Sequence, residues 1–232
     1  MLSQDRPSKV FADIFPPREI RILGAGRFGS QAAEKTRHKF PDAAITITGR
    51  DAGKVERISR ELGIRGEVDD SIRSLTQQPP ADHVWIVPTV PVHVAFEWVL
   101  HELSKEKDGV TRLKVPAEAE PQVPNPIRSP VGTTVYTSVE TFICPDFCAE
   151  PEEACTKSGK ARIINLFEIF DEIVIPEFKP VVLRSWQLAG GVGGYPARSM
   201  MGLLGAVAQK PGKYLIGTAC RCHGVLDALE WR

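Results

Sequence analysis

Short apolar runs and longer helical stripes alternate along the first half of the chain. Residues 19–23, 44–48 and 83–87 are apolar runs with the length and composition of buried strands. Apolar residues recur at helical spacing in residues 51–62 and 92–103, and a helix is also expected after the first run. This alternation predicts a doubly wound α/β fold, with a mostly parallel sheet built by right-handed crossovers.

A glycine loop follows the first apolar run directly, with the pattern G-x-G-x-x-G at Gly24, Gly26 and Gly29. Gly24 permits a tight turn, Gly26 has no side chain to obstruct a pyrophosphate, and Gly29 lets the next helix pack closely. Arg27 and Phe28 stand where that helix begins, beside its free N–H groups. The loop therefore predicts a dinucleotide site made of these five residues, and a plain structural turn is the alternative.

The end of the second strand bears on which dinucleotide is bound. Gly49 and Arg50 stand where an NAD-binding protein places an acidic residue on the ribose. Arg50 can form charge-assisted bonds to a 2′-phosphate, so NADP is preferred, although Asp51 could still reach a ribose of NAD. Pro88 and Thr89, at the end of the third apolar run, are expected beside the nicotinamide.

Residues 19–103 resemble the Rossmann-type NAD(P)-binding domains of dehydrogenases and reductases, through GAGRFG and the strand that ends in TGR. The resemblance implies a Rossmann-type sheet and a nicotinamide cofactor. The Gly-Arg ending is similar to that of NADP-using reductases, while a freestanding module of this kind also resembles the nucleotide-sensing domains of potassium-uptake regulators. No catalytic residue carries over, because no His, Lys or Tyr stands in a matching family pattern.

Prolines crowd the stretch after residue 113, where they forbid a regular helix and favour an extended segment. They are Pro116, Pro121, Pro124, Pro126 and Pro130. We therefore divide the chain into a dinucleotide-binding part, 1–112, and a cysteine-containing α/β part, 113–232. The second part is expected to extend the same sheet or to form a small second lobe, with strands at 133–140 and 181–188, a helix at 163–170 and a last strand at 213–219.

A second glycine cluster, Gly190, Gly191, Gly193 and Gly194, lies between a strand pattern and a helical run. The Lys-Ser or Lys-Thr of a P-loop is missing, so ATP hydrolysis is not supported. The cluster could bind a phosphate or carboxylate, close over the cofactor, or form a tight structural turn.

All five cysteines fall in the last third of the chain, in two groups. Cys144, Cys148 and Cys155 share a loop rich in proline and acidic residues, and Cys220 and Cys222 directly precede His223. Thiolates on irregular backbone can hold tetrahedral zinc or an iron–sulfur cluster, so the two groups are predicted to meet around one metal. Buried or redox-active thiols are the alternative.

Composition narrows the classes of partner. Lys+Arg and Asp+Glu are 29 each, so no basic excess indicates nucleic acid or an anionic membrane. The first 18 residues are too charged for a secretory signal, which makes the cytoplasm the expected compartment. The odd cysteine count argues against a disulfide framework.

Taken together, these patterns predict an NADP-linked oxidoreductase acting on a small molecule. Hydride transfer needs a positioned proton donor, for which His223 and Tyr195 are the candidates. His93 also attracts interest, because it follows the strand end that should border the nicotinamide. A non-catalytic NAD(P)-binding sensor is the main alternative, and a homo-oligomer is compatible with either function.

Overall fold

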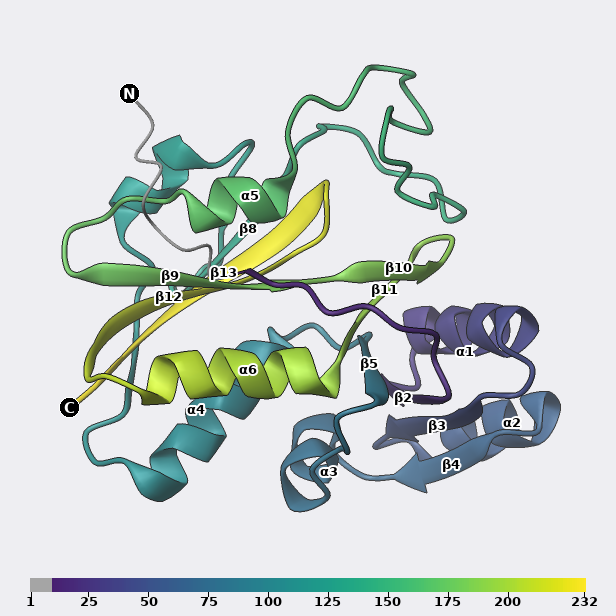
Figure 1. Cartoon of the computed structure of the whole chain (residues 1–232). Coiled ribbons are helices and arrows are strands. Elements are labelled where there is room, and N and C mark those ends of the chain that lie inside the picture. Colours follow the sequence, from purple (N-terminus) through teal and green to yellow (C-terminus); the bar gives the residue numbers. More distant parts are fainter. Residues whose placement is uncertain (1–9) are drawn as a thin grey trace.

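The chain forms an α/β structure with two mixed β-sheets (Figure 1). The computed structural model describes residues 10–232. The α/β class predicted from the sequence is confirmed, but the strands form two sheets that each contain parallel and antiparallel pairs. Residues 1–9 lie outside the described residues. They belong to the predicted first unit and to the segment that is too charged for a secretory signal.

Four parallel strands occur in the first sheet in the order β4-β3-β2-β5. They are β2 (Glu19–Leu23), β3 (Ala44–Gly49), β4 (Arg65–Val68) and β5 (Val84–Pro88). Ile22 pairs with Ile47 on one side and with Val87 on the other, so the three predicted apolar runs are neighbours. Two antiparallel strands, β11 (Val192–Pro196) and β10 (Trp186–Ala189), extend this sheet beyond β5.

Helices cover both faces of the first sheet. They are α1 (Arg27–Lys39) and α2 (Ala52–Leu62) on one face, and α3 (Ser71–Gln77), α4 (Val94–Glu106) and α6 (Ala197–Ala208) on the other. In α2 the predicted apolar face is correct, since Val55 and Ile58 are buried. The Asp51 side chain caps the start of α2, and Gly63 ends it with a left-handed φ of 61°.

The second sheet has the order β1-β9-β12-β13-β8-β7, with β6 also paired to β13. Its strands are β1 (Val10–Phe11), β6 (Thr111–Leu113), β7 (Ile127–Arg128), β8 (Thr134–Ser138), β9 (Phe178–Arg184), β12 (Gly212–Ala219) and β13 (His223–Trp231). A short 3₁₀ helix (Ala117–Gln122) and α5 (Leu166–Asp171) complete the described elements. Both sheets thus contain strands from either side of residue 112.

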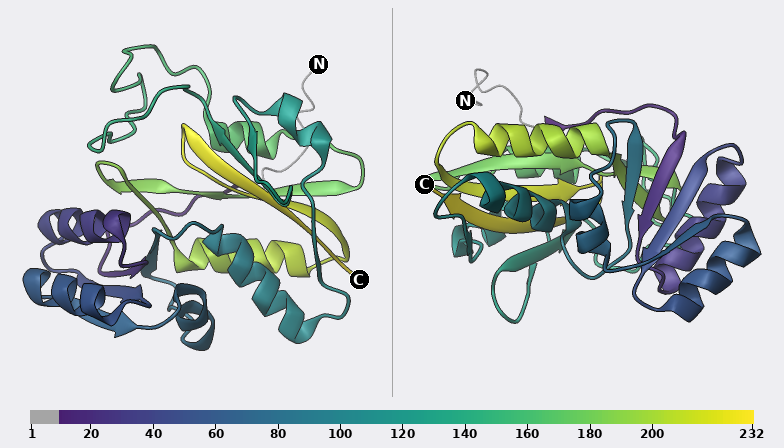
Figure 2. Two further views of the ribbon diagram at one scale, coloured as in Figure 1. Left: turned by 180° about the vertical axis from the view of Figure 1, so that it is seen from behind. Right: turned by 90° about the horizontal axis from the view of Figure 1, so that it is seen from below.

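Helices α4 and α6 form a layer that the two sheets share (Figure 2). Side chains of β9 alternate between the two faces of the second sheet, as a period of two requires. Val181 and Leu183 join the cluster around α4 and α6, while Val182 packs in the cluster around α5. The cluster around α4 and α6 therefore contains residues from both halves of the chain.

Three details differ from the sequence predictions. The run expected as one strand at 181–188 is broken at Ser185, and its second part turns into the first sheet as β10. The strand at 213–219 is not the last one, because β13 follows it and pairs with it along its whole length. The expected helix at 163–170 is shorter and begins at Leu166.

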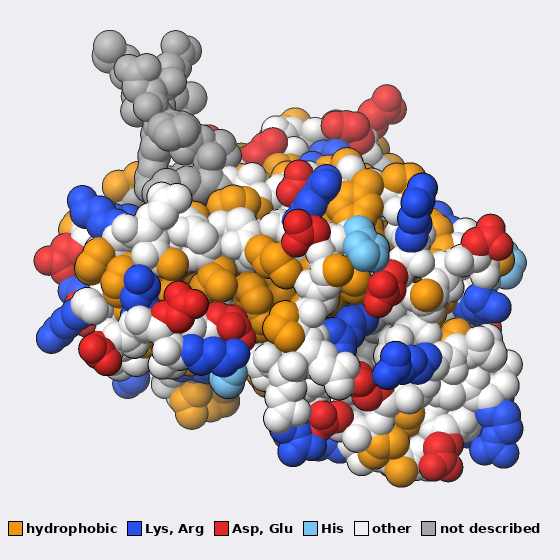
Figure 3. Space-filling model, turned by 60° about the horizontal axis from the view of Figure 1, so that its bottom comes forward, with side chains coloured by type: hydrophobic (Ala, Val, Ile, Leu, Met, Phe, Trp, Pro, Cys, Tyr) orange, Lys and Arg blue, Asp and Glu red, His pale blue; other side chains and the backbone are white. Residues whose placement is uncertain are grey.

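Acidic and basic side chains are interspersed on the face shown in Figure 3. That distribution agrees with the balance of 29 basic and 29 acidic residues in the whole chain. Within residues 10–232, none of the helices combines the length and the apolar character that a membrane crossing demands.

Candidate functional site

The loop between β2 and α1 shows why its glycines are needed. Gly24 has a φ of 118°, which side chains rarely tolerate, and its N–H donates to the Thr48 carbonyl at 2.8 Å. A Cβ on Gly29 would lie 1.8 Å from the Gly24 carbonyl oxygen, so only glycine lets α1 start here. A Cβ on Gly26 would meet no protein atom within 4 Å. Gly26 is thus not required by packing, and its missing side chain leaves space beside the loop.

That space is part of a cavity of about 690 Å³, which we call the glycine groove. Its lining includes Gly24, Ala25, Gly26, Gly49, Arg50 and Thr89. The groove lies at the carboxyl ends of β2, β3 and β5, where open α/β sheets bind ligands. Of the other predicted cofactor residues, Phe28 and Pro88 line a second cavity instead, and Arg27 and Gly29 line neither cavity.

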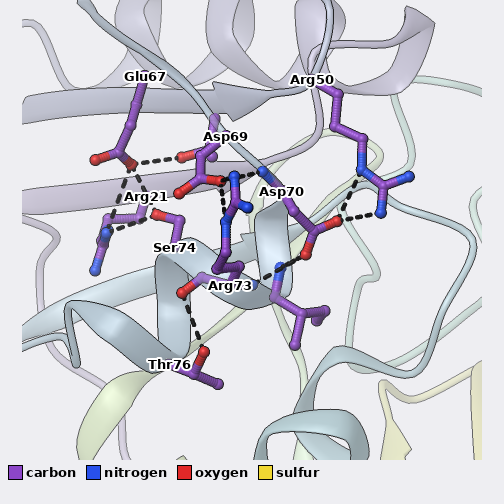
Figure 4. Close-up of polar contacts among 10 residues, drawn as sticks. Arg21, Arg50, Glu67, Asp69, Asp70, Arg73, Ser74 and Thr76 are labelled. Atoms are coloured by element: carbon purple, nitrogen blue, oxygen red, sulfur yellow. Dashed lines mark hydrogen bonds and ion pairs between the residues drawn. The ribbon is translucent and has the colours of Figure 1, made fainter.

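Arg50 extends over the groove and forms an ion pair with Asp70 (Figure 4). Its Nε donates to Asp70 Oδ2 at 2.9 Å, yet 82% of the Arg50 side chain remains exposed. Asp70 also caps α3 by accepting the N–H groups of Ile72 and Arg73. The N–H of Arg73, together with Arg50, lowers the pKa of the Asp70 carboxyl. The groove therefore holds an accessible guanidinium beside an ionised carboxylate.

A second polar network holds the strands beneath the groove in place (Figure 4). Glu67 Oε2 accepts hydrogen bonds from Thr48 Oγ1 at 3.0 Å and from Ser74 Oγ at 2.8 Å, and it lies 3.7 Å from Arg21 Nη2. Arg21 is buried in β2, so its charge is compensated rather than exposed to a ligand. This network joins β2, β3, β4 and α3 and serves the sheet.

The second cavity, about 540 Å³, lies between the first sheet and the cysteine segments; we call it the cysteine cavity. It is lined by Cys144, Cys148, Cys220, Cys222 and His223, and also by Phe28, Lys35, Glu150 and Gln187. Thr89, Val90 and Pro91 line both cavities. The two spaces therefore adjoin at the end of β5, where the nicotinamide was predicted.

The second glycine cluster allows the cysteine loop to dock. A Cβ on Gly190 would lie 2.7 Å from the Phe147 carbonyl oxygen, and a Cβ on Gly191 would lie 2.5 Å from that of Asp146. Gly191 has a φ of 70° and donates its N–H to the Cys148 carbonyl at 2.9 Å. The glycines thus form the β10–β11 hairpin, which agrees with a structural turn, and Gly191 and Gly193 also line the cysteine cavity.

Cys144 and His223 meet although they are far apart in the sequence. Cys144 Sγ lies 3.6 Å from His223 Nε2, and Cys220 Sγ lies 3.9 Å from His223 Nδ1. Burial, and then the neighbouring thiolates of Cys148 and Cys222, raise the pKa of the Cys144 thiol. Burial lowers the pKa of His223, so its imidazole is neutral near pH 7.

Cys155 lies in a small hairpin beside the other cysteines, outside the lining of the cavity. Hydrogen bonds from the Ser158 side chain and from the N–H groups of Ser158 and Lys157 lower the pKa of its thiol. Within residues 10–232, no three His, Cys, Asp or Glu side chains are arranged to hold one ion. The two cysteine groups do meet, since Cys144 and Cys220 both lie beside His223, but the metal stays a prediction.

Two predicted residues lie away from the cavities. Tyr195 is only 1% exposed in the apolar core, where burial raises the pKa of its phenol, and it lines neither cavity. His93 is buried between Asp227 Oδ2, 3.0 Å from its Nδ1, and Thr218 Oγ1, 2.8 Å from its Nε2. Tyr195 is thus unable to reach a substrate in the cysteine cavity, and His93 links α4 to the second sheet.

Sequence reasoning missed several polar residues of the cysteine cavity. Gln187 lines it, and within residues 10–232 the buried Gln187 Oε1 has no hydrogen-bond partner. Glu150 is buried at the wall and accepts the N–H of Arg221. Lys35 donates to the Gly190 carbonyl at 2.8 Å. None of these stands in a recognisable motif, so only the fold identifies them.

Comparisons with known proteins give a family and a relative. Residues 95–232 match the family model AF_1314_C, described as "Uncharacterized protein, C-terminal domain". The chain is also similar to a protein of Archaeoglobus fulgidus described as "Uncharacterized protein", with 24% identity over 222 residues, 90% of this chain and 98% of that protein. No solved structure matches the chain.

Proposed function

We propose that this protein, which belongs to the AF_1314_C family, is an NADP-linked oxidoreductase acting on a small molecule. The observation that carries the proposal is the junction of the two cavities at Thr89, Val90 and Pro91. A dinucleotide in the glycine groove has its nicotinamide at this junction, and the cysteine cavity then holds the substrate against it.

The parallel part of the first sheet supports nucleotide binding. When these four strands are numbered in chain order, they lie in the order 3-2-1-4, which matches the first four strands of a Rossmann-type sheet, and the glycine loop follows the first of them. The N-terminus of α1 begins at Arg27, directly after Gly26, so its free N–H groups and positive dipole end favour a phosphate. We therefore assign the pyrophosphate to Gly24 and Gly26.

The preference for NADP rests on Arg50. Its guanidinium is largely exposed and lines the groove, where it can bind a 2′-phosphate. Lys54 adds a second positive charge, although its Nζ lies 3.1 Å from Asp51 Oδ2. Both cations already have carboxylate partners. Phosphate binding therefore replaces Asp70 at Arg50, and the loss of that ion pair offsets part of the favourable binding free energy. NAD remains the competing ligand.

His223 is the predicted proton-transferring residue that lies on the cysteine cavity. Because burial lowers its pKa, the neutral imidazole accepts a proton, as oxidation of an alcohol to a carbonyl requires. Gln187 Oε1 offers a hydrogen-bond acceptor to the substrate from the same wall. We therefore expect a hydroxyl- or carbonyl-bearing substrate.

The test begins with isothermal titration calorimetry, in which NADP(H) and NAD(H) are titrated into the intact protein. Arg50→Ala should lose most of the preference for NADP(H), whereas Arg57→Ala, an exposed arginine on α2 outside the groove, should keep it. Equal binding of both nucleotides by the wild type would remove the case for NADP. Absence of binding would overturn the proposal.

A second candidate function, a nucleotide-binding sensor, is favoured by exposed apolar residues near the cysteine loop. Ile143, Phe147 and Ile163 are 90%, 71% and 94% exposed, as in a surface that meets a protein partner. A screen of alcohols and carbonyl compounds, followed by cofactor absorbance, separates the two functions. Turnover that falls in His223→Ala supports the enzyme, while nucleotide-dependent partner binding without turnover supports the sensor.

A further inference from the structure

The second sheet brings the two cysteine groups to the same edge. Ser138, at the end of β8, pairs with His223, at the start of β13, in antiparallel register. The N–H of Val139 donates to the Cys222 carbonyl at 2.8 Å, which continues that pairing past the strands. The chain that leaves β8 towards Cys144 therefore starts beside the turn that carries Cys222.

Contacts on both sides of Cys155 hold it against the first two cysteines of the loop. Thr156 Oγ1, in the next residue, lies 3.4 Å from Cys148 Sγ. Lys157 Nζ donates to the carbonyl of Ile143, the residue before Cys144, at 3.1 Å. Three thiols of the loop are therefore gathered by interactions between their immediate neighbours.

Arg162 connects this hairpin to the fourth thiol. Its N–H bonds to the Glu153 carbonyl at 2.8 Å, across the hairpin that contains Cys155. Its guanidinium Nη1 lies 2.7 Å from Cys222 Sγ. This contact holds the Cys222 sulfur beside the hairpin that contains Cys155.

We propose that Cys144, Cys148, Cys155 and Cys222 bind one zinc ion. Four thiolates on two irregular segments are an established ligand set for tetrahedral zinc, with Zn–S bonds of about 2.3 Å and sulfurs about 3.8 Å apart. The ion draws the four sulfurs together from their present arrangement. The loop spacing of three and then six residues differs from ferredoxin spacings, which favours a single ion over an iron–sulfur cluster.

Cys220 is left out of the ligand set because it already has another role. Its sulfur accepts the N–H groups of Cys222 at 3.4 Å and of His223 at 3.3 Å, and it faces His223 Nδ1. These contacts shape the turn that presents Cys222. Cys220 is therefore the matched control within the same cluster.

Zinc at this position closes one wall of the cysteine cavity. It joins the loop that contains Cys144 to the turn before β13, while the glycine hairpin supports the loop from the other side. The inference does not depend on nucleotide binding, so each can fail without the other.

The first experiment uses the intact wild-type protein, purified anaerobically without added metal. Elemental analysis should find one zinc per chain, and cobalt(II) exchanged into the site should give thiolate charge-transfer absorption and the visible bands of a tetrahedral ion. After chelation, added zinc should protect Cys144, Cys148, Cys155 and Cys222 from alkylation. Protection of Cys220 should not depend on zinc.

Variants then test the ligand set in the full chain. Serine at any one of the four proposed ligands should weaken zinc binding more than about 100-fold, beyond the effect of removing an outer contact. Cys220→Ser and His223→Ala should keep one zinc per chain. Iron or no metal in the wild type, protection that omits one of the four thiols, or equal loss in Cys220→Ser would overturn the proposal.

Discussion

Two glycines of the loop after β2 should respond in opposite ways to a side chain. Gly26 has an ordinary backbone, with φ −80° and ψ −167°, and its Cβ would meet no protein atom within 4 Å. Gly26→Val should therefore change the free energy of unfolding by less than about 0.5 kcal/mol. The added side chain instead occupies the glycine groove, where the pyrophosphate is expected.

The size of the binding effect follows from the contacts that the side chain would displace. Two charge-assisted bonds from backbone N–H groups to phosphate contribute about 1.5 kcal/mol each or more, so their loss weakens NADP(H) binding roughly 150-fold. Isothermal titration calorimetry measures this loss, and urea unfolding of the same samples measures stability. Wild-type affinity in Gly26→Val would show that no phosphate approaches the loop.

Gly29→Ala should, in contrast to Gly26→Val, lower the stability of the protein. Its Cβ would lie 1.8 Å from the Gly24 carbonyl oxygen, so the backbone has to move. We expect a destabilisation of at least about 2 kcal/mol, or roughly 4 to 8 °C in Tm. Gly205→Ala is the control, because its Cβ meets nothing within 4 Å and Gly205 lies in α6 outside both cavities. It should leave nucleotide binding unchanged.

Three further changes test separate parts of the structure. Asp70→Asn keeps a helix cap but removes the ion pair with Arg50, so calorimetry should show the affinity for NADP(H) rising several-fold relative to that for NAD(H). An unchanged ratio of the two affinities would show that Arg50 does not bind the 2′-phosphate. Gly191→Ala places a Cβ against the cysteine loop at a φ of 70°, and limited proteolysis should then cut that loop faster than in the wild type, with equal rates counting against docking. Asp227→Asn weakens the buried bond to His93, so urea unfolding should show a loss of about 2 to 3 kcal/mol; a loss below about 0.5 kcal/mol would contradict its structural role.

The sequence predicted the parts of the fold that depend on neighbouring residues. The strand at 19–23, the glycine loop and the following helix are local features, because periodicity and turn chemistry act within a few residues. The separation into two sheets was not predictable in that way. Whether β9 pairs with β12 or with a strand of the first half depends on the packing of α4 and α6. That packing cannot be predicted from the pattern of neighbouring residues.

β13 was missed for a physical reason that can be stated. Residues 223–231 include Leu226, Ala228, Leu229 and Glu230, which favour helices, and Asp227, which is unusual inside a sheet. Pairing with β12 along the whole strand overrides these preferences, and Asp227 is accepted because His93 and Thr134 donate to it. Tertiary contacts thus decide an element that propensity assigns wrongly.

The missed strand also explains why the sequence predicted a cysteine cluster but not which of its residues lie side by side. Cys144 follows β8 and Cys222 precedes β13, so only the antiparallel pairing of these strands places both cysteines at one edge. With β13 recognised, the register of Ser138 opposite His223 would have predicted the meeting directly. Because that register is set by burial on both faces of the second sheet, the candidate metal site depends on the core as much as on its own ligands.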